Sequence, residues 1–492
     1  MAYLGLVEDG LAIISFCLVC FATRSLFAWR FRLVGIDSWV HLLAAEEIRL
    51  NGFRIPKEHL ASHFILRGTI AYPPLLHYLI AIFPTRAFLF LSRYLSAFFD
   101  AVHVALLFAL VKLLTGEFLP ASLAATAFVF TPRSFEESLS LTPRPLGSLL
   151  LTLTLASLLL SQTTFQGHVQ LLFLISAFAC ALVLLCHKMA TQALAFLALS
   201  LTLAGLWVSV LVLITGFALA TAISRGYTLK MIREHLAILR FWSRYVAQLG
   251  SQIRITVGKI RFLGASNPWS VYPLLVLFFL PPVGVSYVRL ISYFAIWSIV
   301  ALLLAIVTSL WKRVMFLGQG VRYLDYAAFP SAVVVGIMST YVSQDLLFYG
   351  LFVGLLAISI VKMRRSFRTT SRLKDYVLSS DLLDCIEAIR ESPRDNVLCI
   401  PATLTAAVAY FARKRVLNTS SPYAYGELFS IFTVAGYVPI MPIEQIVRKY
   451  EIGLILVERT LEASVNACNV EAMHANSTYS VYETRTAIGW PS

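Results

Sequence analysis

Long apolar runs separated by polar intervals extend from residue 10 to residue 361. A helix needs about 20 apolar residues to cross the hydrocarbon core of a bilayer. The pattern therefore predicts a polytopic α-helical membrane protein with about 9–11 transmembrane helices. The simplest division gives ten spans, at residues 10–29, 91–111, 118–133, 145–161, 169–186, 191–223, 271–290, 292–311, 325–342 and 345–361.

Two of these runs decide the number of spans. Residues 189–224 carry no charge, and as one helix they would be ~54 Å long, against a hydrocarbon core of about 30 Å. They form either one overlong helix or two short helices bent near Gly205. Splitting this run gives eleven spans, whereas counting residues 271–311 as one crossing gives nine. An odd number places the two ends of the membrane part on opposite sides.

Three polar or amphipathic segments interrupt the membrane part. The first external loop covers residues 30–74 and ends at Pro73-Pro74, which a continuous helix cannot contain. A second loop covers residues 131–145. Residues 225–261 repeat apolar side chains every three or four positions and carry eight Lys or Arg against the single acid Glu234. This segment is typical of a basic amphipathic helix in the membrane interface, which either contacts lipid phosphates or only connects two spans.

The last part of the chain has a different pattern. Residues 396–400, 415–417 and 452–457 read as strands, and residues 402–412 and 443–449 read as helices. Alternating strands and helices predict a small soluble α/β domain at residues 371–492, after a membrane domain at residues 1–370. This tail contains no phosphate-binding glycine loop, so nothing in it indicates a nucleotide site.

Composition supports the membrane class. Hydrophobic residues make up 59% of the 492 residues and charged residues only 13%, against roughly 25% charged residues in soluble domains. The net charge of +14 suits Lys and Arg that flank spans and meet anionic lipid, rather than a nucleic-acid partner. The seven cysteines form no disulfide framework. Residues 11–29 lack a preceding basic region and a cleavage site, so they are expected to be a retained span.

Several polar residues stand out against this background. Asp37 follows the first apolar run, and His41 shares its face if the segment is helical. Asp100 lies inside a predicted span, where an acid is either functional or paired with Arg93 or His103. His59 and His63 have helical spacing, but no matching carboxylate accompanies them, which disfavours a zinc site.

The order of these features resembles the GT-C superfamily of membrane glycosyltransferases. This superfamily includes the protein O-mannosyltransferases, the aminoarabinose transferases and the catalytic subunits of oligosaccharyltransferase. The α/β tail is similar to the extracytoplasmic domains of several members. One departure is that the first loop has no strict Asp-x-Asp pair. The motifs that carry the resemblance are Gly35-x-Asp37 with His41 and Asn51-Gly52, Tyr72-Pro73-Pro74, Arg93 to Asp100, Glu136-Glu137, His187-Lys188, and Arg322-Tyr323 ahead of Pro330.

The resemblance implies that a sugar leaves a polyprenyl-phosphate or polyprenyl-diphosphate carrier and reaches an acceptor lipid, glycan or protein with inversion at the anomeric carbon. Asp37 is then the expected catalytic base. Glu136 or Glu137 would orient the acceptor. Alternatively, Asp37 and Glu137 would hold a divalent cation, Mg²⁺ or Mn²⁺, through carboxylate oxygens. The expected substrate-binding residues, which include the cations for the leaving phosphate, are His41, Arg144, His187, Lys188, Arg322 and Tyr323.

The resemblance also implies a location. It requires Asp37, Glu137, Arg322 and the tail to lie on the extracytoplasmic side of the plasma membrane, and therefore an odd number of spans. The basic cluster at residues 362–374 argues against an outside tail. The alternative functions are a transporter or flippase of lipid-linked saccharides and a saccharide polymerase. A transporter is disfavoured because the sequence shows no internal repeat.

Overall fold

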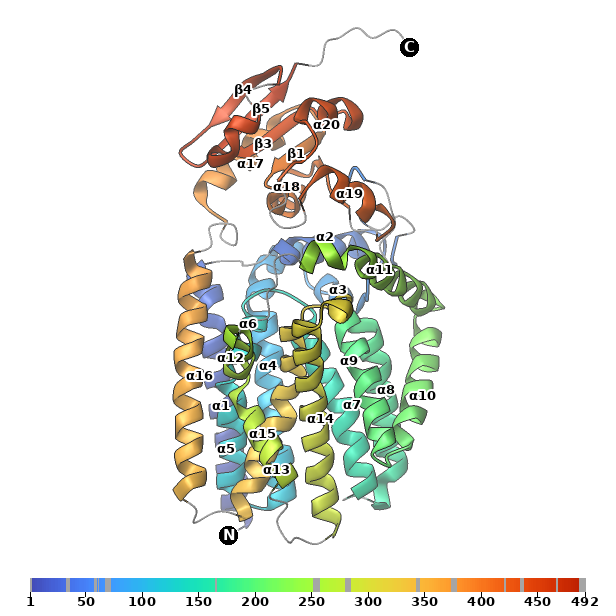
Figure 1. Cartoon of the computed structure of the whole chain (residues 1–492), viewed down its shortest axis with the longest axis vertical. Coiled ribbons are helices and arrows are strands. Elements are labelled where there is room, and N and C mark those ends of the chain that lie inside the picture. Colours follow the sequence, from blue (N-terminus) through green and yellow to red (C-terminus); the bar gives the residue numbers. More distant parts are fainter. Residues whose placement is uncertain are drawn as a thin grey trace.

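The computed structural model shows a helical bundle with a small α/β domain at one end and the N-terminus at the other (Figure 1). The structure describes residues 2–31, 36–56, 60, 62–66, 72–163, 166–250, 257–278, 285–341, 346–372, 378–419, 422–433, 438–465 and 468–485. His59 and Gly35 lie outside the described residues. The polytopic helical class with a C-terminal α/β domain is confirmed.

The bundle contains long helices that are apolar enough to cross a membrane. Among the described residues there are seven such stretches, within α1 (Ala2–Phe31), α4 (Thr85–Thr115), α7 (Arg144–Thr163), α8 (Val169–Cys186), α14 (Val285–Leu310), α15 (Asp325–Tyr341) with its preceding turn, and α16 (Leu346–Arg372). The shorter apolar helices α5 (Phe118–Val129), α9 (Lys188–Leu203), α10 (Val208–Ile223) and α13 (Val271–Phe278) stand among them (Figure 1).

Both ambiguous runs are divided in the structure. The charge-free run forms α9 and α10, which pack against each other after a turn in which Gly205 has a φ of +96°. A positive φ of this size is available to glycine at little cost. The run at residues 271–311 forms α13 and α14 rather than one crossing. The simplest division into ten spans is therefore wrong in this region, because it joins α9 and α10 into one helix.

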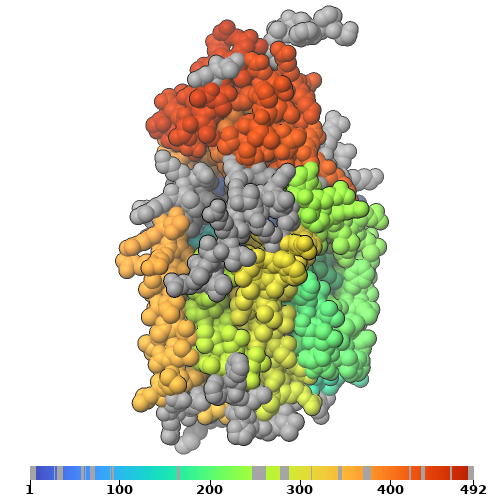
Figure 2. Space-filling model, in the orientation of Figure 1, coloured from blue at the N-terminus to red at the C-terminus, as the bar shows by residue number. Residues whose placement is uncertain are grey.

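The basic segment forms two helices, of which the first, α11 (Tyr227–Gly250), lies across the end of the bundle and the second, α12 (Val257–Ser266), lies lower beside α16 (Figure 1). Helix α11 turns by 114° from α10. Phe241 and Trp242 of α11 contact Phe429, with ring centroids 5.9 and 5.6 Å apart. Phe429 belongs to α19 (Tyr425–Ile431), so α11 supports the α/β domain, which the space-filling view shows seated directly on it (Figure 2).

The C-terminal domain is built on one mixed sheet. Its strands are β1 (Asn396–Ile400), β2 (Arg415–Val416), β3 (Leu454–Glu458), β4 (Val470–Ala475) and β5 (Tyr479–Thr484), in the order β2-β1-β3-β5-β4. β1 is parallel to β2 and β3, whereas β5 is antiparallel to β3 and β4. The helices of the domain are α17 (Ser380–Glu391), α18 (Thr405–Ala412), α19 and α20 (Ile443–Tyr450). The first three strands coincide with the predicted ones, and the hairpin β4–β5 was not predicted.

The acid inside the membrane part is paired. Asp100 of α4 accepts a hydrogen bond from Arg24 Nε of α1 at 3.1 Å, and both side chains are buried. The expected partners Arg93 and His103 are therefore wrong. His103 instead lies 2.8 Å from the Thr152 hydroxyl and stacks on Phe329. Asp100 joins α1 to α4, which supports the structural reading of this acid.

Candidate functional site

Asp37 lies at the end of the bundle that faces the α/β domain. It occupies the first turn of α2 (Ile36–Leu50), where a carboxylate interacts favourably with the helix dipole. Its side chain is 66% exposed, and its Oδ2 lies 3.9 Å from Nη2 of Arg144, the first residue of α7. The predicted base is therefore an accessible carboxylate beside one cation.

Glu137 lies in the short helix α6 (Pro132–Ser138) and is held between two arginines. Its carboxylate pairs with Arg133, one turn earlier, and with Arg144. The side chain is only 4% exposed. Burial lowers the pKa of Arg133 to about 10, which leaves its guanidinium charged at neutral pH. Arg144 thus connects Glu137 to Asp37, and the structure brings these two predicted acids to a common cation.

The Glu136 side chain faces the last membrane helix, α16. It accepts hydrogen bonds from Arg133, at 3.1 Å, and from Ser366 of α16, and it lies 3.9 Å from Lys362. These partners join α6 to the last membrane helix. The structure therefore separates Glu136 from Asp37, although the two acids of α6 are adjacent in sequence.

Two histidines and a tyrosine lie beneath Asp37. His41 Nδ1 lies 2.9 Å from Nε2 of His77, which belongs to α3 (Leu75–Ala81). The Tyr72 ring is 5.5 Å from that of His41. Burial lowers the pKa of His41 to about 4, although the Asp37 carboxylate acts in the opposite direction. Burial also raises the pKa of Tyr72, and Asp37 adds to this rise.

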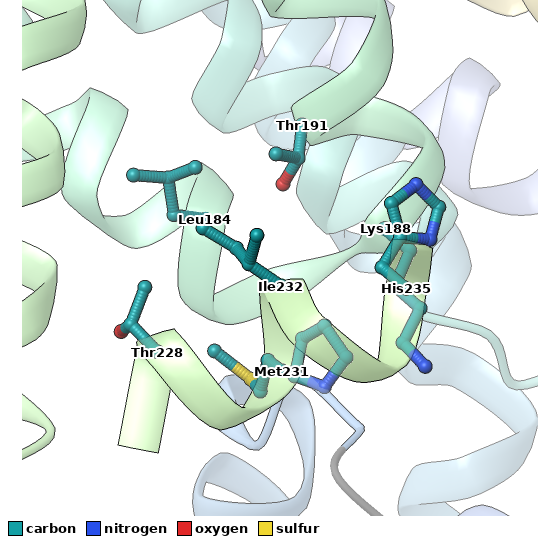
Figure 3. A pocket seen from close by; sticks show the side chains of 8 residues that line it. Leu184, Lys188, Thr191, Thr228, Met231, Ile232 and His235 are labelled. Carbon is teal, nitrogen blue, oxygen red and sulfur yellow. The ribbon is translucent and has the colours of Figure 1, made fainter. Parts of the chain in front are cut away.

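Lys188 and His187 lie at the junction of α8 and α9, where Lys188 approaches Tyr72. They stand between α8 and α9, where His187 Nδ1 lies 3.2 Å from the Tyr326 hydroxyl and the Lys188 ammonium lies 5.4 Å from the Tyr72 ring centroid. Lys188 also faces a pocket between α8, α9 and α11 (Figure 3). The rest of this pocket is mainly apolar and is lined by Pro73, Leu184, Thr191, Thr228, Met231, Ile232 and His235.

Arg322 and Tyr323 lie in the 3₁₀ turn η4 (Gly320–Leu324), which leads into α15. The charge of Arg322 interacts with those of Arg144 and Asp37. Tyr323 is fully buried and its hydroxyl donates to the Leu317 carbonyl at 3.1 Å. Arg322 therefore belongs to the site, and Tyr323 holds the turn that carries it.

Three residues of this site were not among the predicted ones. Arg133 could have been suspected from its i,i+4 spacing to Glu137. His77 and Tyr326 gave no signal, because the partner of each comes from a distant part of the chain, His41 for His77 and His187 for Tyr326.

A divalent cation at Asp37 and Glu137 does not fit this arrangement. The Glu137 carboxylate is already neutralised by Arg133 and Arg144, and Arg144 also lies beside Asp37. A cation placed between the two acids would meet two guanidinium groups at short range, which is electrostatically unfavourable. In the described part of the chain, no group of three or more His, Cys, Asp or Glu is arranged to hold a metal ion.

Solved structures share this architecture. ArnT from Cupriavidus metallidurans, bound to undecaprenyl phosphate, aligns with a TM-score of 0.60 at 12% identity over 99% of this chain and 99% of that chain. The oligosaccharyltransferase AglB from Archaeoglobus fulgidus, with an inhibitory peptide and a dolichol-phosphate, aligns with a TM-score of 0.57 at 14% identity over 92% and 70%. The chain has the GT-C fold.

The same oligosaccharyltransferase in complex with Zn and sulfate gives a TM-score of 0.60 at 14% identity, over 92% of this chain and 68% of that chain. No protein-family model and no curated protein matches the sequence. The likeness is therefore one of fold. Both neighbours are membrane glycosyltransferases.

The burial of His41 predicts that the stability of the protein depends on pH. The folded-state pKa of His41 is about 4, whereas an unfolded histidine has a pKa near ~6.5. Between these values the unfolded chain binds a proton that the folded chain does not, so the free energy of unfolding falls as the pH drops, by up to about 1.4 kcal/mol per pH unit. Above this window both states are neutral at His41 and the contribution is constant.

Thermal unfolding in detergent at pH 7 and pH 5 tests this effect with the variant His41→Gln. The wild type should lose more thermal stability on acidification than the variant does. An equal loss in both proteins would show that the titration of His41 does not contribute.

Proposed function

We propose that this GT-C chain is an inverting glycosyltransferase, which moves a sugar from a polyprenyl-phosphate or polyprenyl-diphosphate carrier to an acceptor at the extracytoplasmic face of the plasma membrane. One observation carries the proposal. The exposed Asp37 carboxylate stands beside a cluster of guanidinium groups, those of Arg144, Arg133 and Arg322, at the end of a membrane bundle. A base next to an anion-binding cluster is what transfer from a phosphate leaving group needs.

The reaction is a single displacement. Asp37 accepts the proton of the acceptor hydroxyl or amide, and the acceptor atom attacks the anomeric carbon. The bond from this carbon to the phosphate oxygen breaks, and its electron pair stays on the phosphate. Arg144 and Arg322 stabilise the charge that develops there. Attack opposite to the leaving phosphate inverts the anomeric configuration.

The pocket beside Lys188 suits the carrier. The pocket itself has room for little more than a water molecule, so in this proposal the carrier opens it and places its phosphate near the Lys188 ammonium and its isoprenoid carbons along the apolar wall (Figure 3). His187 precedes Lys188 and is held by its contact with the Tyr326 hydroxyl. The neighbours with undecaprenyl phosphate and dolichol-phosphate support a polyprenyl carrier of this kind.

The decisive experiment uses purified protein in lipid vesicles with a panel of radiolabelled polyprenyl-phosphate sugars and candidate acceptors. Release of polyprenyl phosphate together with a glycosylated acceptor supports the proposal. Movement of an intact lipid-linked sugar across the vesicle bilayer would indicate a flippase, and growth of a saccharide on the carrier would indicate a polymerase.

Arg322 offers a test of the anion-binding cluster. Arg322→Ala should weaken the binding of undecaprenyl phosphate by roughly tenfold to a hundredfold, because a hydrogen bond to a charged group contributes about 1.5–3 kcal/mol. The matched control is Arg313→Ala, which removes an exposed cation from the neighbouring turn η3 (Lys312–Leu317) and should leave the affinity unchanged. Similar affinities for wild type and Arg322→Ala would remove Arg322 from the carrier site.

A further inference from the structure

Helix α2 has two faces that serve different parts of the molecule. At about 100° per residue, Asp37 and His41 share one face, and Trp39 and Glu46 share the opposite one. The first face looks onto the bundle, where His41 meets His77 of α3. The second face looks onto the C-terminal domain, which lies above α2 in Figure 1. The helix that carries the proposed base is thus held between the two domains.

Trp39 is the apolar contact of the second face. Its side chain is buried, with its ring 5.4 Å from that of Tyr410 and 4.8 Å from that of Phe411. Both partners belong to α18 of the C-terminal domain. Aromatic pairs at these distances stabilise a contact beyond the area that they bury. Trp39 is only two residues from Asp37, so α18 packs directly against the turn that bears the carboxylate.

Arg413 adds a polar contact to the same face. It follows α18 with a φ of +59°, so that its guanidinium turns back toward α2. Nη1 donates to Glu46 Oε2 at 2.6 Å and Nη2 to Glu46 Oε1 at 3.0 Å. The guanidinium carbon also lies 5.1 Å from the Tyr410 ring centroid. A bidentate pair of this kind fixes orientation as well as distance.

The chain beyond α2 joins the sheet of the C-terminal domain. Residues 62–66 lie parallel to β2, since Val416 donates to the His63 carbonyl at 3.0 Å and Ile65 donates to the Val416 carbonyl at 2.9 Å. Leu66 is buried in the apolar core of the domain. Glu47 of α2 accepts a hydrogen bond from the Ser62 hydroxyl at 3.0 Å. Residues 62–66 of the first loop are therefore joined to the edge of the C-terminal sheet through an isolated bridge at Phe64, and they are tied back to α2.

We infer that the C-terminal domain is a positioning part of the active site. The domain fixes the position of α2 through the Arg413–Glu46 pair and through the contacts of Trp39 with the aromatic rings of α18. In this way it keeps Asp37 beside Arg144. Arg413 and Tyr410 are positioning residues that act through α2 and contact no reacting atom. That the domain affects sugar transfer rests on the proposed function. That the domain fixes the position of α2 does not depend on it.

The experiment compares three variants of the full-length protein in nanodiscs. Arg413→Ala removes the bidentate pair, and the double exchange Arg413→Glu with Glu46→Arg reverses it. Arg394→Ala is the matched control, because Arg394 forms a similarly exposed pair with Glu483 within the C-terminal domain. For each variant we would measure hydrogen exchange of the α2 amides, binding of undecaprenyl phosphate, and kcat for sugar transfer.

In Arg413→Ala, exchange of the α2 amides should rise by about fivefold, the factor expected for a pair worth about 1 kcal/mol. The kcat should fall by up to about a hundredfold, because small misplacements of a catalytic group are costly. Carrier affinity should stay unchanged. The reversed pair should restore both exchange and kcat toward the wild type, and Arg394→Ala should change neither.

Unchanged α2 exchange in Arg413→Ala would overturn the inference, and so would faster exchange with an unchanged kcat. Tyr410→Leu provides a second variant if Arg413→Ala fails to fold. If the wild type transfers no sugar at all, the proposed function fails, and the exchange of α2 alone then decides whether the domain positions this helix.

Discussion

Asp37→Asn should reduce sugar transfer by roughly 10²–10⁴-fold, the usual contribution of a general base. The amide is nearly isosteric with the carboxylate but cannot accept the acceptor proton. Because Asp37 is largely exposed and its nearest charged partner, Arg144, lies 3.9 Å away, the change should leave stability and carrier binding almost unaffected. The loss should therefore appear in kcat, measured in vesicles with a radiolabelled polyprenyl-phosphate sugar.

The chain offers a matched control for this substitution. Asp395 is 78% exposed and lies 3.5 Å from the Lys414 ammonium, an environment close to that of Asp37, but it belongs to the C-terminal domain. Asp395→Asn should transfer sugar at the wild-type rate. Wild-type turnover by a correctly folded Asp37→Asn protein would show that another group takes the proton.

The membrane class and the first acid were predictable because both depend on local sequence. Apolar runs of about 20 residues indicate spans wherever they occur, and an acid directly after a span stands at the membrane surface. The division of residues 189–224 was not predictable. Gly205 permits the turn, but only the packing of α10 against α8 and α9 decides that the run folds back on itself.

The roles of Glu136 and Glu137 could not be separated from sequence. The two side chains point about 100° apart around α6. One reaches Lys362 and Ser366 of α16, and the other reaches Arg144 of α7. Lys362 and Ser366 are distant in sequence, and Arg144 follows Glu137 by seven residues but belongs to another helix, so pattern alone treats the two acids as equivalent. The expectation of a metal ion shared by Asp37 and Glu137 came from the family resemblance, and the pairing of Glu137 with two arginines could not be read from the sequence.

The β4–β5 hairpin and the pairing of residues 62–66 with β2 escaped prediction for related reasons. Most of β4 is exposed, and its sequence Val-Glu-Ala-Met-His-Ala has little of the alternation that marks a strand. The segment at residues 62–66 pairs with the sheet only because β2 lies beside it. Edge pairing of this kind depends on the tertiary fold, and it is also what links the first loop to the C-terminal domain.

Glu137→Gln should destabilise the protein more than any other single exchange in the site. The glutamine keeps the size of the side chain but leaves Arg133 and Arg144 without their shared buried partner. Removing one member of a buried ion pair costs about 3–5 kcal/mol, because the remaining charge is left uncompensated. We expect a clear drop in the thermal unfolding temperature in detergent, together with loss of transfer, because Arg144 is no longer held in place between Glu137 and Asp37.

Two further variants separate this cause from a general effect of losing an acid. Glu387→Gln breaks an exposed pair with Arg390 and should change stability by less than about 1 kcal/mol. The double variant Glu137→Gln with Arg133→Gln removes one of the two guanidinium groups that lose their partner in Glu137→Gln. It should therefore regain part of the lost stability. If the double variant is less stable than Glu137→Gln alone, the damage does not come from an unpaired guanidinium. The cluster would then be held together by packing rather than by the charge balance around Glu137.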